Sequence, residues 1–475
     1  MQRLFPDSFY ENVFGTITIK TNSAQIKNSE EKLKDNYGQL PTSLVTFSDI
    51  YGQLQTSLRT ITDIKKSKNI ELIEVTTFRK ESGYSDRRHP DIVTFTDKIE
   101  EDLARRDFTI NAMAMRLDGS IVDPYEGQKD LEDKIIRAVG NPDTRFQEDA
   151  LRMMRAIRFF VTLDFAISDK TLNAIVTNKK LIMDISAERI RDELVKIINA
   201  RRAQEGIELL QEVGLLKEIL PELAAGFNVG QNKHHIYTVF EHNVRALGWC
   251  AKNNYEFHVR IASLLHDVGK PQTKRGDGVD STFYGHEIVG ARITRKALQR
   301  LKFPNEIIEK VWLLVRYHLF YYNVGEVTER SVRRLLAKVG PENINDLLQV
   351  RQADRIGSGV PKAMPYRLRH FQYMIEKVQK DPTSVKMLAV NGNDIMEQLH
   401  VEPGPLVGQI LAILLDEVLD DPTRNTKEYL LNKAQKLSKL KPEELQNRRK
   451  ESEEKQKQLD EEVHEEIRER YWVKE

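Results

Sequence analysis

The feature that most constrains the fold of this 475-residue chain is a helical period that begins near residue 146 and continues almost to the end. Pro221 and the Gly226–Gly230 stretch separate one helical block from the next. Three further prolines interrupt the region that follows: Pro361, Pro365 and Pro382. A Pro-Gly-Pro turn at 403–405 then predicts the start of an apolar helix that runs to about residue 419. The body of the molecule is therefore expected to be a series of helical units.

The N-terminal part has a different pattern. Residues 12–19 and 69–79 alternate between apolar and polar side chains and are rich in β-branched residues, which predicts strands. Between them, 37–50 and 51–64 form a tandem repeat that matches at ten of fourteen positions. Repeat folds need about three units to bury a core, so we interpret the 20–66 segment as an insertion, either a flexible loop or an extra hairpin. From 98 to 131 short helix, strand and turn alternate.

Composition places the chain among globular proteins, with 40% hydrophobic and 31% charged residues. A single cysteine, Cys250, rules out an internal disulfide framework and fits a reducing compartment. The first residues lack a signal pattern, and no apolar run approaches the roughly 20 residues of a membrane span. A cytoplasmic protein with no membrane partner is expected. The net charge is only +1, so binding of RNA would depend on local basic clusters.

The segment EDALRMMRAIRFF, from Glu148 to Phe160, carries two patterns. One is an apolar stripe, predicted to be buried, formed by Leu151, Met154, Ile157 and Val161. The other is a charged ribbon with a step of three residues, expected to wind away from the core, formed by Asp149, Arg152, Arg155 and Arg158. A surface helix with a Glu148–Arg152 ion pair is the plain alternative.

The charged ribbon also suits the recognition of two nucleobases. Cytosine and adenine both present an amino donor beside a ring-nitrogen acceptor, whereas uracil and guanine present the reverse polarity. One carboxylate and one guanidinium satisfy the first pattern, and the wrong base leaves buried groups unpaired at roughly 1–3 kcal/mol each. Asp149 and Arg152 are therefore predicted to act as a protein template for C and A. Arg155 and Arg158 are suited to triphosphate oxygens.

Three stretches resemble class II tRNA nucleotidyltransferases and bacterial poly(A) polymerases in order and spacing: RRDFTINAMAM (105–115), DPYEGQKDLEDKIIRAVGNPDTRFQEDALRMMRAIRF (123–159) and AERIRDEL (187–194). Such enzymes add CCA, part of it, or a poly(A) tail to RNA 3′ ends without a nucleic-acid template. The resemblance spans about residues 5–435, apart from the 20–66 segment. It implies an α+β chain with a small mixed-sheet nucleotidyltransferase head, followed by mostly α-helical neck, HD and tail domains.

The resemblance also implies the substrates and the residues that bind them. The RNA partner would be a tRNA or another RNA 3′ end, and the nucleotides would be CTP and ATP. Full CCA addition, CC-only, A-only and poly(A) addition all remain open. The nucleotide-binding residues would be Arg106 on the nucleotide, Asp107 and Asn111 shaping the pocket, Asp149 and Arg152 reading the base, and Arg155 and Arg158 on the phosphates. Glu188 and Arg189 would belong to a neck-helix motif beside them.

The catalytic carboxylates of that family are not found at the expected place. Its members open with a glycine-rich turn and an Asp-x-Asp pair that holds two Mg²⁺ ions at the RNA 3′-hydroxyl and the leaving pyrophosphate. Residues 4–19, LFPDSFYENVFGTITI, align with the stretch just after that pair, so the head is expected to be incomplete. Glu74 is the candidate for a remaining third acid, and an ordinary strand glutamate is the alternative.

Three explanations of the missing acids remain open. The chain is an N-terminally truncated product, or it is half of a split enzyme whose second polypeptide supplies the acids, or it has lost transferase activity. The first two are favoured because the base-reading residues are present and have little use without chemistry nearby. Without the metal pair, nearly all the rate of such a transfer should be lost.

A second set of residues predicts a metal centre in the 216–380 region: His242, His266, Asp267, His286, His318 and Asp354. Imidazoles mixed with carboxylates suit Mn, Fe, Ni, Zn or Mg. The pattern resembles the HD phosphohydrolase domain that many class II nucleotidyltransferases carry. By that resemblance His242, His266, Asp267 and Asp354 would hold one metal, which His286 and His318 extend to two. A bound metal would generate hydroxide for attack on a phosphoester, such as a cyclic phosphate at an RNA end.

The expected domains are a head remnant at 1–145, a neck at 146–215, an HD domain at 216–380, a tRNA-binding tail at 381–440 and a charged helical extension at 441–475. Four basic residues before the tail are candidates for phosphate contacts or plain surface charge: Arg330, Arg333, Arg334 and Lys338. Two rival functions stay open beside the transferase. One is an HD phosphohydrolase with a vestigial head, acting on RNA-end phosphates or nucleotides, and the other is a non-catalytic RNA-binding subunit.

Overall fold

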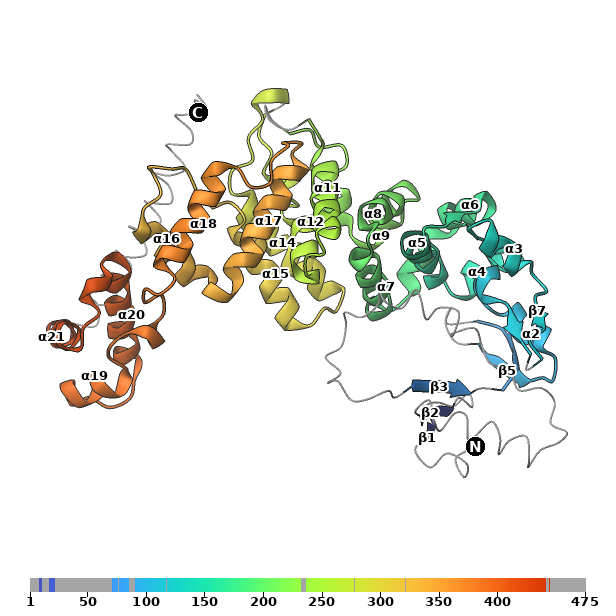
Figure 1. The fold of residues 1–475 in the computed structure, drawn as a ribbon, viewed down its shortest axis with the longest axis horizontal. Coiled ribbons are helices and arrows are strands. Elements are labelled where there is room, and N and C mark those ends of the chain that lie inside the picture. Colours follow the sequence, from blue (N-terminus) through green and yellow to red (C-terminus); the bar gives the residue numbers. More distant parts are fainter. Residues whose placement is uncertain are drawn as a thin grey trace. The chain divides into compact units, whose positions relative to one another are not determined.

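The computed structural model describes residues 8–10, 17–21, 71–75, 77–84, 90–116, 118–231, 236–276, 278–320, 322–440 and 444. The chain divides into two compact units (Figure 1). The first contains the residues up to Ala224 together with Gln299–Phe303, and the second contains Ala225–Leu298 and the residues from Pro304 onward. The change from one unit to the next falls at the break that Pro221 and Gly226 predict. The tandem repeat at 37–64 and the extension at 441–475, apart from Glu444, lie outside the described residues.

Short antiparallel strands form the beginning of the first unit. A three-stranded sheet has the order β1-β2-β3, and the pairs β4-β5 and β6-β7 are separate. These strands are β1 (Ser8–Tyr10), β2 (Ile17–Thr21), β3 (Glu71–Val75), β4 (Arg79–Ser82), β5 (Ile92–Phe95), β6 (Ala114–Met115) and β7 (Ile121–Val122). The strand predicted over 12–19 overlaps β2 at 17–19, with 12–16 outside the described residues, and the strand predicted over 69–79 contains β3, with Ile17 opposite Val75. The second prediction was too long, because β4 begins a new strand pair at Arg79.

Helices make up the rest of the first unit. They are α2 (Ile99–Ala104), η3 (Thr109–Asn111), α3 (Gly127–Glu132), α4 (Pro142–Glu148), α5 (Leu151–Leu163), α6 (Asp169–Asn178), η4 (Lys179–Asp184), α7 (Ala187–Asn199), α8 (Ala203–Glu212), α9 (Leu215–Ile219) and α10 (Pro221–Ala224). Two parallel strands, β8 (Ile135–Ile136) and β9 (Ala166–Ile167), pair beside α5.

The centre of the first unit is α5. Its predicted apolar stripe is confirmed, since Leu151, Met154, Ile157 and Val161 are all buried. Helices α7 and α8 pack against it. The close approach of α8 requires Gly206, where an added Cβ would lie 2.8 Å from a methyl carbon of Val161.

The second unit is entirely helical in its described residues. Its helices are α11 (Val239–Lys252), α12 (Phe257–Leu265), α13 (Lys270–Thr273), η5 (Gly278–Asp280), α14 (His286–Arg300), α15 (Asn305–Tyr317), α16 (Glu329–Val339), η6 (Pro341–Asn343), α17 (Ile344–Gly357), α18 (Tyr366–Val378), η7 (Val385–Met387), α19 (Gly392–Leu399), α20 (Pro405–Asp420), η8 (Pro422–Arg424) and α21 (Lys427–Leu437). Helix α11 packs on α12 and α17, and α12 also packs on α15 (Figure 1).

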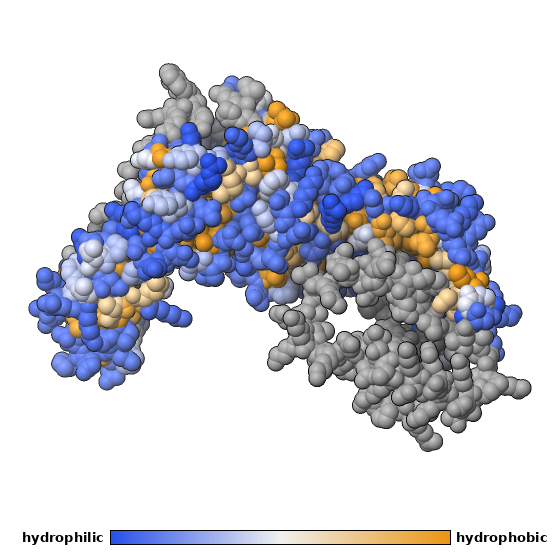
Figure 2. Space-filling view, viewed as in Figure 1, coloured by the Kyte–Doolittle hydropathy of each residue, from blue (hydrophilic) through white to orange (hydrophobic). Residues whose placement is uncertain are grey.

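The last helices surround a small apolar core of their own. Helix α20 begins at Pro405 directly after the predicted Pro-Gly-Pro turn, as expected from the fixed φ of proline at a first helical position. Ile395 of α19, Ile410 and Leu414 of α20, and Leu430 of α21 are fully buried together. Within the described residues, no helix has both the length and the apolar character needed to cross a membrane. Accordingly, the described face in Figure 2 is mainly hydrophilic, with only isolated hydrophobic areas.

The basic residues of α16 bind within the protein, so the expectation that they contact phosphates is wrong for two of them. Arg333 and Arg334 are buried. Arg333 Nε donates to Leu419 O at 2.8 Å, and Arg334 Nη2 lies 2.8 Å from Asp420 Oδ1. Arg330 also pairs with Asp420, at 2.5 Å. These arginines join α16 to the end of α20, because buried guanidinium groups need compensating acceptors.

Candidate functional site

Asp149 lies between two helices rather than on one. Helix α4 ends at Glu148, Asp149 has extended backbone angles (φ −143°, ψ 102°), and α5 begins at Leu151. The carboxylate of Asp149 accepts the Leu151 N–H at 3.0 Å and pairs with Arg189 Nη2 at 2.7 Å. The prediction that Asp149 continues the helical ribbon is therefore wrong, because its side chain holds the free N-terminus of α5.

Arg152 is buried, so the expectation that the ribbon winds away from the core is also wrong. Its Nη1 donates to Glu148 Oε2 at 2.7 Å and to Arg145 O at 3.1 Å, and its Nη2 donates to Arg105 O at 2.9 Å. The predicted Glu148–Arg152 pair is present, and Arg145 also pairs with Glu148. The loop after α2 covers this part of the neck and contributes the acceptor on Arg105.

Asp107 accepts hydrogen bonds from two of the predicted nucleotide-binding residues, and a third is connected to it through Asn111. Its Oδ2 accepts from Arg155 Nε at 2.7 Å, and its Oδ1 accepts from Asn111 Nδ2 at 3.1 Å. Arg106 Nη1 donates to Asn111 O at 3.2 Å. Arg106, Asp107, Asn111 and Arg155 therefore form one network that links η3 and α5, although Arg155 is 48 residues from Asp107 in the sequence.

Burial has the largest single effect and raises the pKa of Asp107, but the Arg155 guanidinium and the hydrogen bonds from Asn111, Arg155 and the Phe108 N–H together keep that pKa below its ordinary value. A carboxyl group whose pKa is lower in the folded state stabilises the fold above its unfolded pKa of about 3.9. That contribution is lost as the pH falls through the folded pKa. The network should therefore be strongest at neutral pH and weaken in acid.

An Asp107→Asn variant is expected to have a free energy of unfolding lower by about 1.5–3 kcal/mol at pH 7, because it removes a hydrogen-bonded charge. The difference from the unmodified chain should shrink as the pH falls below the unfolded pKa of about 3.9 and should vanish only below the lower pKa that Asp107 has in the folded state. Urea denaturation at pH 7 and pH 3.5 measures both values. Asp133→Asn, at an exposed position of the same unit, is the matched control. Equal destabilisation at both pH values would contradict the ionic origin of the network.

The remaining predicted residues of the head and neck have different environments. Arg158 Nη1 pairs with Glu193 Oε1 at 3.2 Å, and Lys196 Nζ contacts the same oxygen at 3.0 Å. The Arg158 guanidinium lies over the Phe159 ring, 4.4 Å from its centroid. Glu74 lies in β3 opposite Thr18, and its side chain is outside the described residues.

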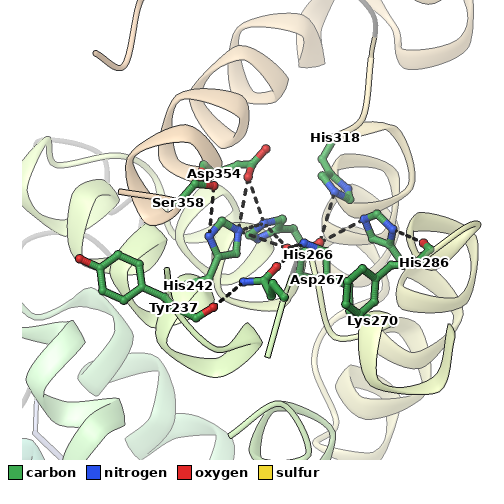
Figure 3. A network of polar contacts seen from close by, with 12 residues as sticks. Tyr237, His242, His266, Asp267, Lys270, His286, His318, Asp354 and Ser358 are labelled. Carbon is green, nitrogen blue, oxygen red and sulfur yellow. Dashed lines mark hydrogen bonds and ion pairs between the residues drawn. The ribbon is translucent and has the colours of Figure 1, made fainter. Parts of the chain in front are cut away.

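The second unit brings together all six side chains that the sequence predicts for a metal centre (Figure 3). Asp267 is central. Its Oδ2 lies 3.2 Å from His242 Nε2 and 3.3 Å from His266 Nε2, and its Oδ1 lies 3.2 Å from His286 Nε2 and 3.8 Å from His318 Nε2. Two three-residue groups, His242–His266–Asp267 and Asp267–His286–His318, could each hold an ion.

Asp354 completes the first group from α17. Its Oδ1 lies 3.3 Å from His242 Nε2, and its Oδ2 accepts from Arg351 Nη1 at 2.5 Å. Gly357 allows α17 to approach α11, because an added Cβ there would lie 2.6 Å from His242 O. Gly269 has the same role at α14, where its Cβ would lie 2.1 Å from His286 O. Both glycines are required for close contact of the backbones.

Backbone acceptors fix the orientation of three of the four imidazoles. The Nδ1 atoms of His266, His286 and His318 lie 2.7, 2.6 and 2.7 Å from the carbonyl oxygens of Ser263, Phe283 and Val315. A carbonyl accepts only, so each Nδ1 carries the proton and each Nε2 is directed at the carboxylates. Histidines that bind metals are commonly oriented in this way.

The ring nitrogens also provide a test of whether a cation fits. His242 Nε2 and His266 Nε2 are only 2.8 Å apart. His286 Nε2 is buried and makes no hydrogen bond within the described residues, although Asp267 Oδ1 lies 3.2 Å away. A lone pair facing a carboxylate oxygen is repulsive unless a proton or a metal ion lies between them. The donor set of imidazoles and carboxylates therefore fits a divalent metal.

Sequence analysis missed two members of this cluster. Lys270 Nζ lies 2.6 Å from Asp267 Oδ2 and donates to Gln231 Oε1 at 2.6 Å, and all three residues are buried. Lys270 lies three residues after Asp267, about one helical turn, and this spacing is the feature of the sequence that could have indicated its place in the cluster. Burial has the largest single effect and lowers the pKa of His266, but the charges and hydrogen bonds of Asp267 and Asp354 together raise that pKa to about 10. Burial and the charge of His266 lower the pKa of His318. The cluster therefore holds carboxylates and basic side chains close together, and a bound metal would change which of these groups pair with each other.

Comparison with known families gives three matches along the chain. Residues 11–137 match the family described as "Poly A polymerase head domain". Residues 164–227 match "Probable RNA and SrmB- binding site of polymerase A", and residues 288–434 match "tRNA nucleotidyltransferase domain 2 putative". The first match includes Arg106, Asp107 and Asn111, and the second includes Arg189 and Glu193.

Among curated proteins, the "A-adding tRNA nucleotidyltransferase" of Deinococcus radiodurans is 35% identical over 344 residues, which cover 69% of this chain and 76% of the relative. The "CCA-adding enzyme" of Limosilactobacillus reuteri is 34% identical over 368 residues, covering 77% and 79%. Among solved structures, the Bacillus stearothermophilus CCA-adding enzyme in complex with CTP has a TM-score of 0.52 and 27% identity, with 81% of each chain covered.

Proposed function

Because the chain belongs to the family of class II CCA-adding enzymes and bacterial poly(A) polymerases, we propose that it adds cytidine and adenosine nucleotides from CTP and ATP to the 3′ end of tRNA. The relatives with the greatest coverage are named for A addition or CCA addition, and the CTP complex of the Bacillus enzyme has the same fold. The residues proposed to bind the nucleotide are those of the Asp107 network together with Asp149, Arg152 and Arg158.

The observation that carries this proposal is the set of hydrogen-bonding groups still available at Asp149 and Arg152. A carboxylate has about four acceptor sites, and Asp149 uses three of them for Arg189 and the Leu151 N–H. A guanidinium has five N–H donors, and Arg152 uses three of them within the described residues. One acceptor and two donors therefore remain for a base, and this is the polarity that cytosine and adenine require.

Ion pairs hold both side chains in place before a nucleotide binds. Arg189 orients the Asp149 carboxylate, and Glu148 orients the Arg152 guanidinium. In the neighbouring network, Arg106 Nε is a buried donor without an acceptor in the described residues. A phosphate or ribose oxygen of the bound nucleotide would satisfy it, because a charge-assisted hydrogen bond to an anion is strong. Preorganised groups of this kind give selectivity at low entropic cost.

The transfer itself also needs divalent metal, in this family Mg²⁺, which supplies Lewis-acid stabilisation at the reacting phosphate. We propose to test one of the two arrangements that the sequence leaves open beside each other, N-terminal truncation and a split enzyme: in the second, another polypeptide supplies the Asp-x-Asp carboxylates that would hold it. Glu74 is retained as a candidate third acid on β3. The residues of this chain would then bind and select the nucleotide, and the partner would complete the catalytic head.

Labelled CMP and AMP should be added to tRNA lacking its CCA end when the chain is supplied with Mg²⁺ and fractions of its host's lysate. The chain alone should add less by several orders of magnitude, since metals and positioning carry most of this catalysis. Gel analysis of the labelled tRNA measures both. Full activity of the purified chain alone would contradict the second-polypeptide proposal. Absence of addition in every fraction would contradict the transferase function.

We propose a second function for the His/Asp cluster, a metal-dependent phosphohydrolase that acts on a phosphoester at an RNA end. The observation in its favour is the convergence of six buried or nearly buried ligand side chains from five segments of the second unit. Asp267 would bind both metal positions, one with each oxygen, and Lys270 would compensate its charge. The metal would supply an activated water, with Mn, Ni, Fe, Zn or Mg as the chemically suitable ions.

A further inference from the structure

The exposed side of α18 carries a row of aromatic rings that neither proposed site uses. Tyr366 and Tyr373 are 64% and 58% exposed, and His370 lies between them. The ring centroids are 6.2 Å apart from Tyr366 to His370 and 6.3 Å apart from His370 to Tyr373. These residues follow one another at intervals of four and three, so they occupy one face of the helix.

The opposite face of α18 fixes the helix in the protein. Leu368, Phe371, Ile375 and Val378 are buried. Phe371 stacks on Phe320 with centroids 4.9 Å apart, and α18 packs on α16. The row of rings is therefore displayed on a rigid support, which lowers the entropic cost of binding a partner.

The surroundings of the rings are cationic. Residues 362–380 contain five lysines or arginines and a single acid, Glu376, although one of the five cations, Lys377, pairs with Glu329 of α16. Arg367 donates to the Asn323 side-chain oxygen and Arg369 donates to Met364 O. Because both acceptors are neutral, the two positive charges stay uncompensated by these contacts. The chain as a whole has a net charge of only +1, so this surface is a local basic cluster.

We propose that this face of α18 binds unpaired nucleotides of the RNA substrate by stacking bases on Tyr366, His370 and Tyr373. The planes of neighbouring rings are tilted by 46° and 50° to each other, so a base would stack on the exposed face of a single ring rather than between two rings. Aromatic rings flanked by cations are typical of single-stranded nucleic-acid binding. A protein partner is less well matched, since the other exposed side chains of α18 are charged or polar: Arg367, Arg369, Gln372, Glu376 and Lys377.

This inference rests on the proposed function, because it assumes that the substrate is RNA. It is tested with the full chain and a short single-stranded oligoribonucleotide that contains 2-aminopurine. The Tyr366→Ala/Tyr373→Ala variant should bind it at least about tenfold more weakly, with loss of the 2-aminopurine quenching that stacking causes. The Tyr366→Phe/Tyr373→Phe variant keeps the rings and should bind like the unmodified chain. Affinity is measured by fluorescence anisotropy at several salt concentrations.

The salt dependence separates stacking from charge. Arg369→Gln should lower the slope of log affinity against log salt by about 0.7, whereas the tyrosine-to-alanine variant should leave that slope unchanged. Unchanged affinity and quenching in the alanine variant would overturn the proposal, and so would equal losses in the phenylalanine variant. CTP binding by the alanine variant should equal that of the unmodified chain. If the unmodified chain did not bind CTP, that result would count against the proposed function, independently of α18.

Discussion

An Asp149→Asn variant is expected to bind CTP and ATP about 10- to 100-fold more weakly, while its weak binding of UTP and GTP changes little. Asparagine keeps one acceptor oxygen, but its NH2 group would face either the Arg189 guanidinium, which donates to both oxygens of Asp149, or the amino group of cytosine or adenine, so one hydrogen bond is replaced by two donors that face each other. An unpaired buried group costs roughly 1–3 kcal/mol, and that cost accounts for the expected range. Titration of the four nucleoside triphosphates by calorimetry measures it without any need for catalysis.

The structure offers a matched control for this variant. Asp192 lies on α7 near Arg189, has a side chain that is 56% exposed and pairs with its neighbour Arg191. An Asp192→Asn variant should bind all four nucleotides like the unmodified chain. An Arg189→Ala variant should weaken CTP and ATP binding by a smaller factor, since it removes the group that orients Asp149 and leaves the acceptor in place. Equally firm binding of all four nucleotides by the unmodified chain would refute the template role.

An Asp267→Ala variant should bind Mn²⁺ on the order of 100-fold more weakly or not at all, because changes at metal-site partners alone cost 10–100-fold and Asp267 is a direct ligand candidate for both positions. A ligand at 100 times its dissociation constant stabilises a folded protein by about 2.7 kcal/mol. Addition of Mn²⁺ should therefore raise the melting temperature of the unmodified chain and leave that of the variant unchanged. Calorimetric titration with Mn²⁺ gives the affinities directly.

Asp346 provides the control, since it forms a second His–Asp pair in the same unit. It lies 2.8 Å from His258 Nε2 and 2.9 Å from Lys310 Nζ, away from the cluster. Asp346→Ala should lower stability and keep the metal-dependent rise in melting temperature. Opening of the 2′,3′-cyclic phosphate of an RNA end to a phosphomonoester should follow the metal, lost in Asp267→Ala and kept in Arg152→Ala. A metal-dependent shift that survives in Asp267→Ala would contradict the proposed centre.

The sequence by itself predicted the helices of the body of this protein and identified the side chains that could bind a metal or a nucleotide. The helical period predicted the helices from α5 onward and the buried face of α5, because periodicity records which side chains avoid water. Residues near each other in sequence also revealed the His266–Asp267 pair and the motif around Arg106 and Asp107. These features are local, so one window of sequence contains all the information they need.

Only the tertiary structure decided which groups face each other. Asp107 pairs with Arg155 across 48 residues, and Asp354 reaches His242 because Gly357 lets two helices touch. The break at Asp149 and the burial of Arg152 depend on Arg189 and on the loop at Arg105, which no helical period could indicate. An ion pair forms where packing brings two side chains within a few ångströms, and a periodic pattern gives the direction of a side chain without the identity of the element opposite it.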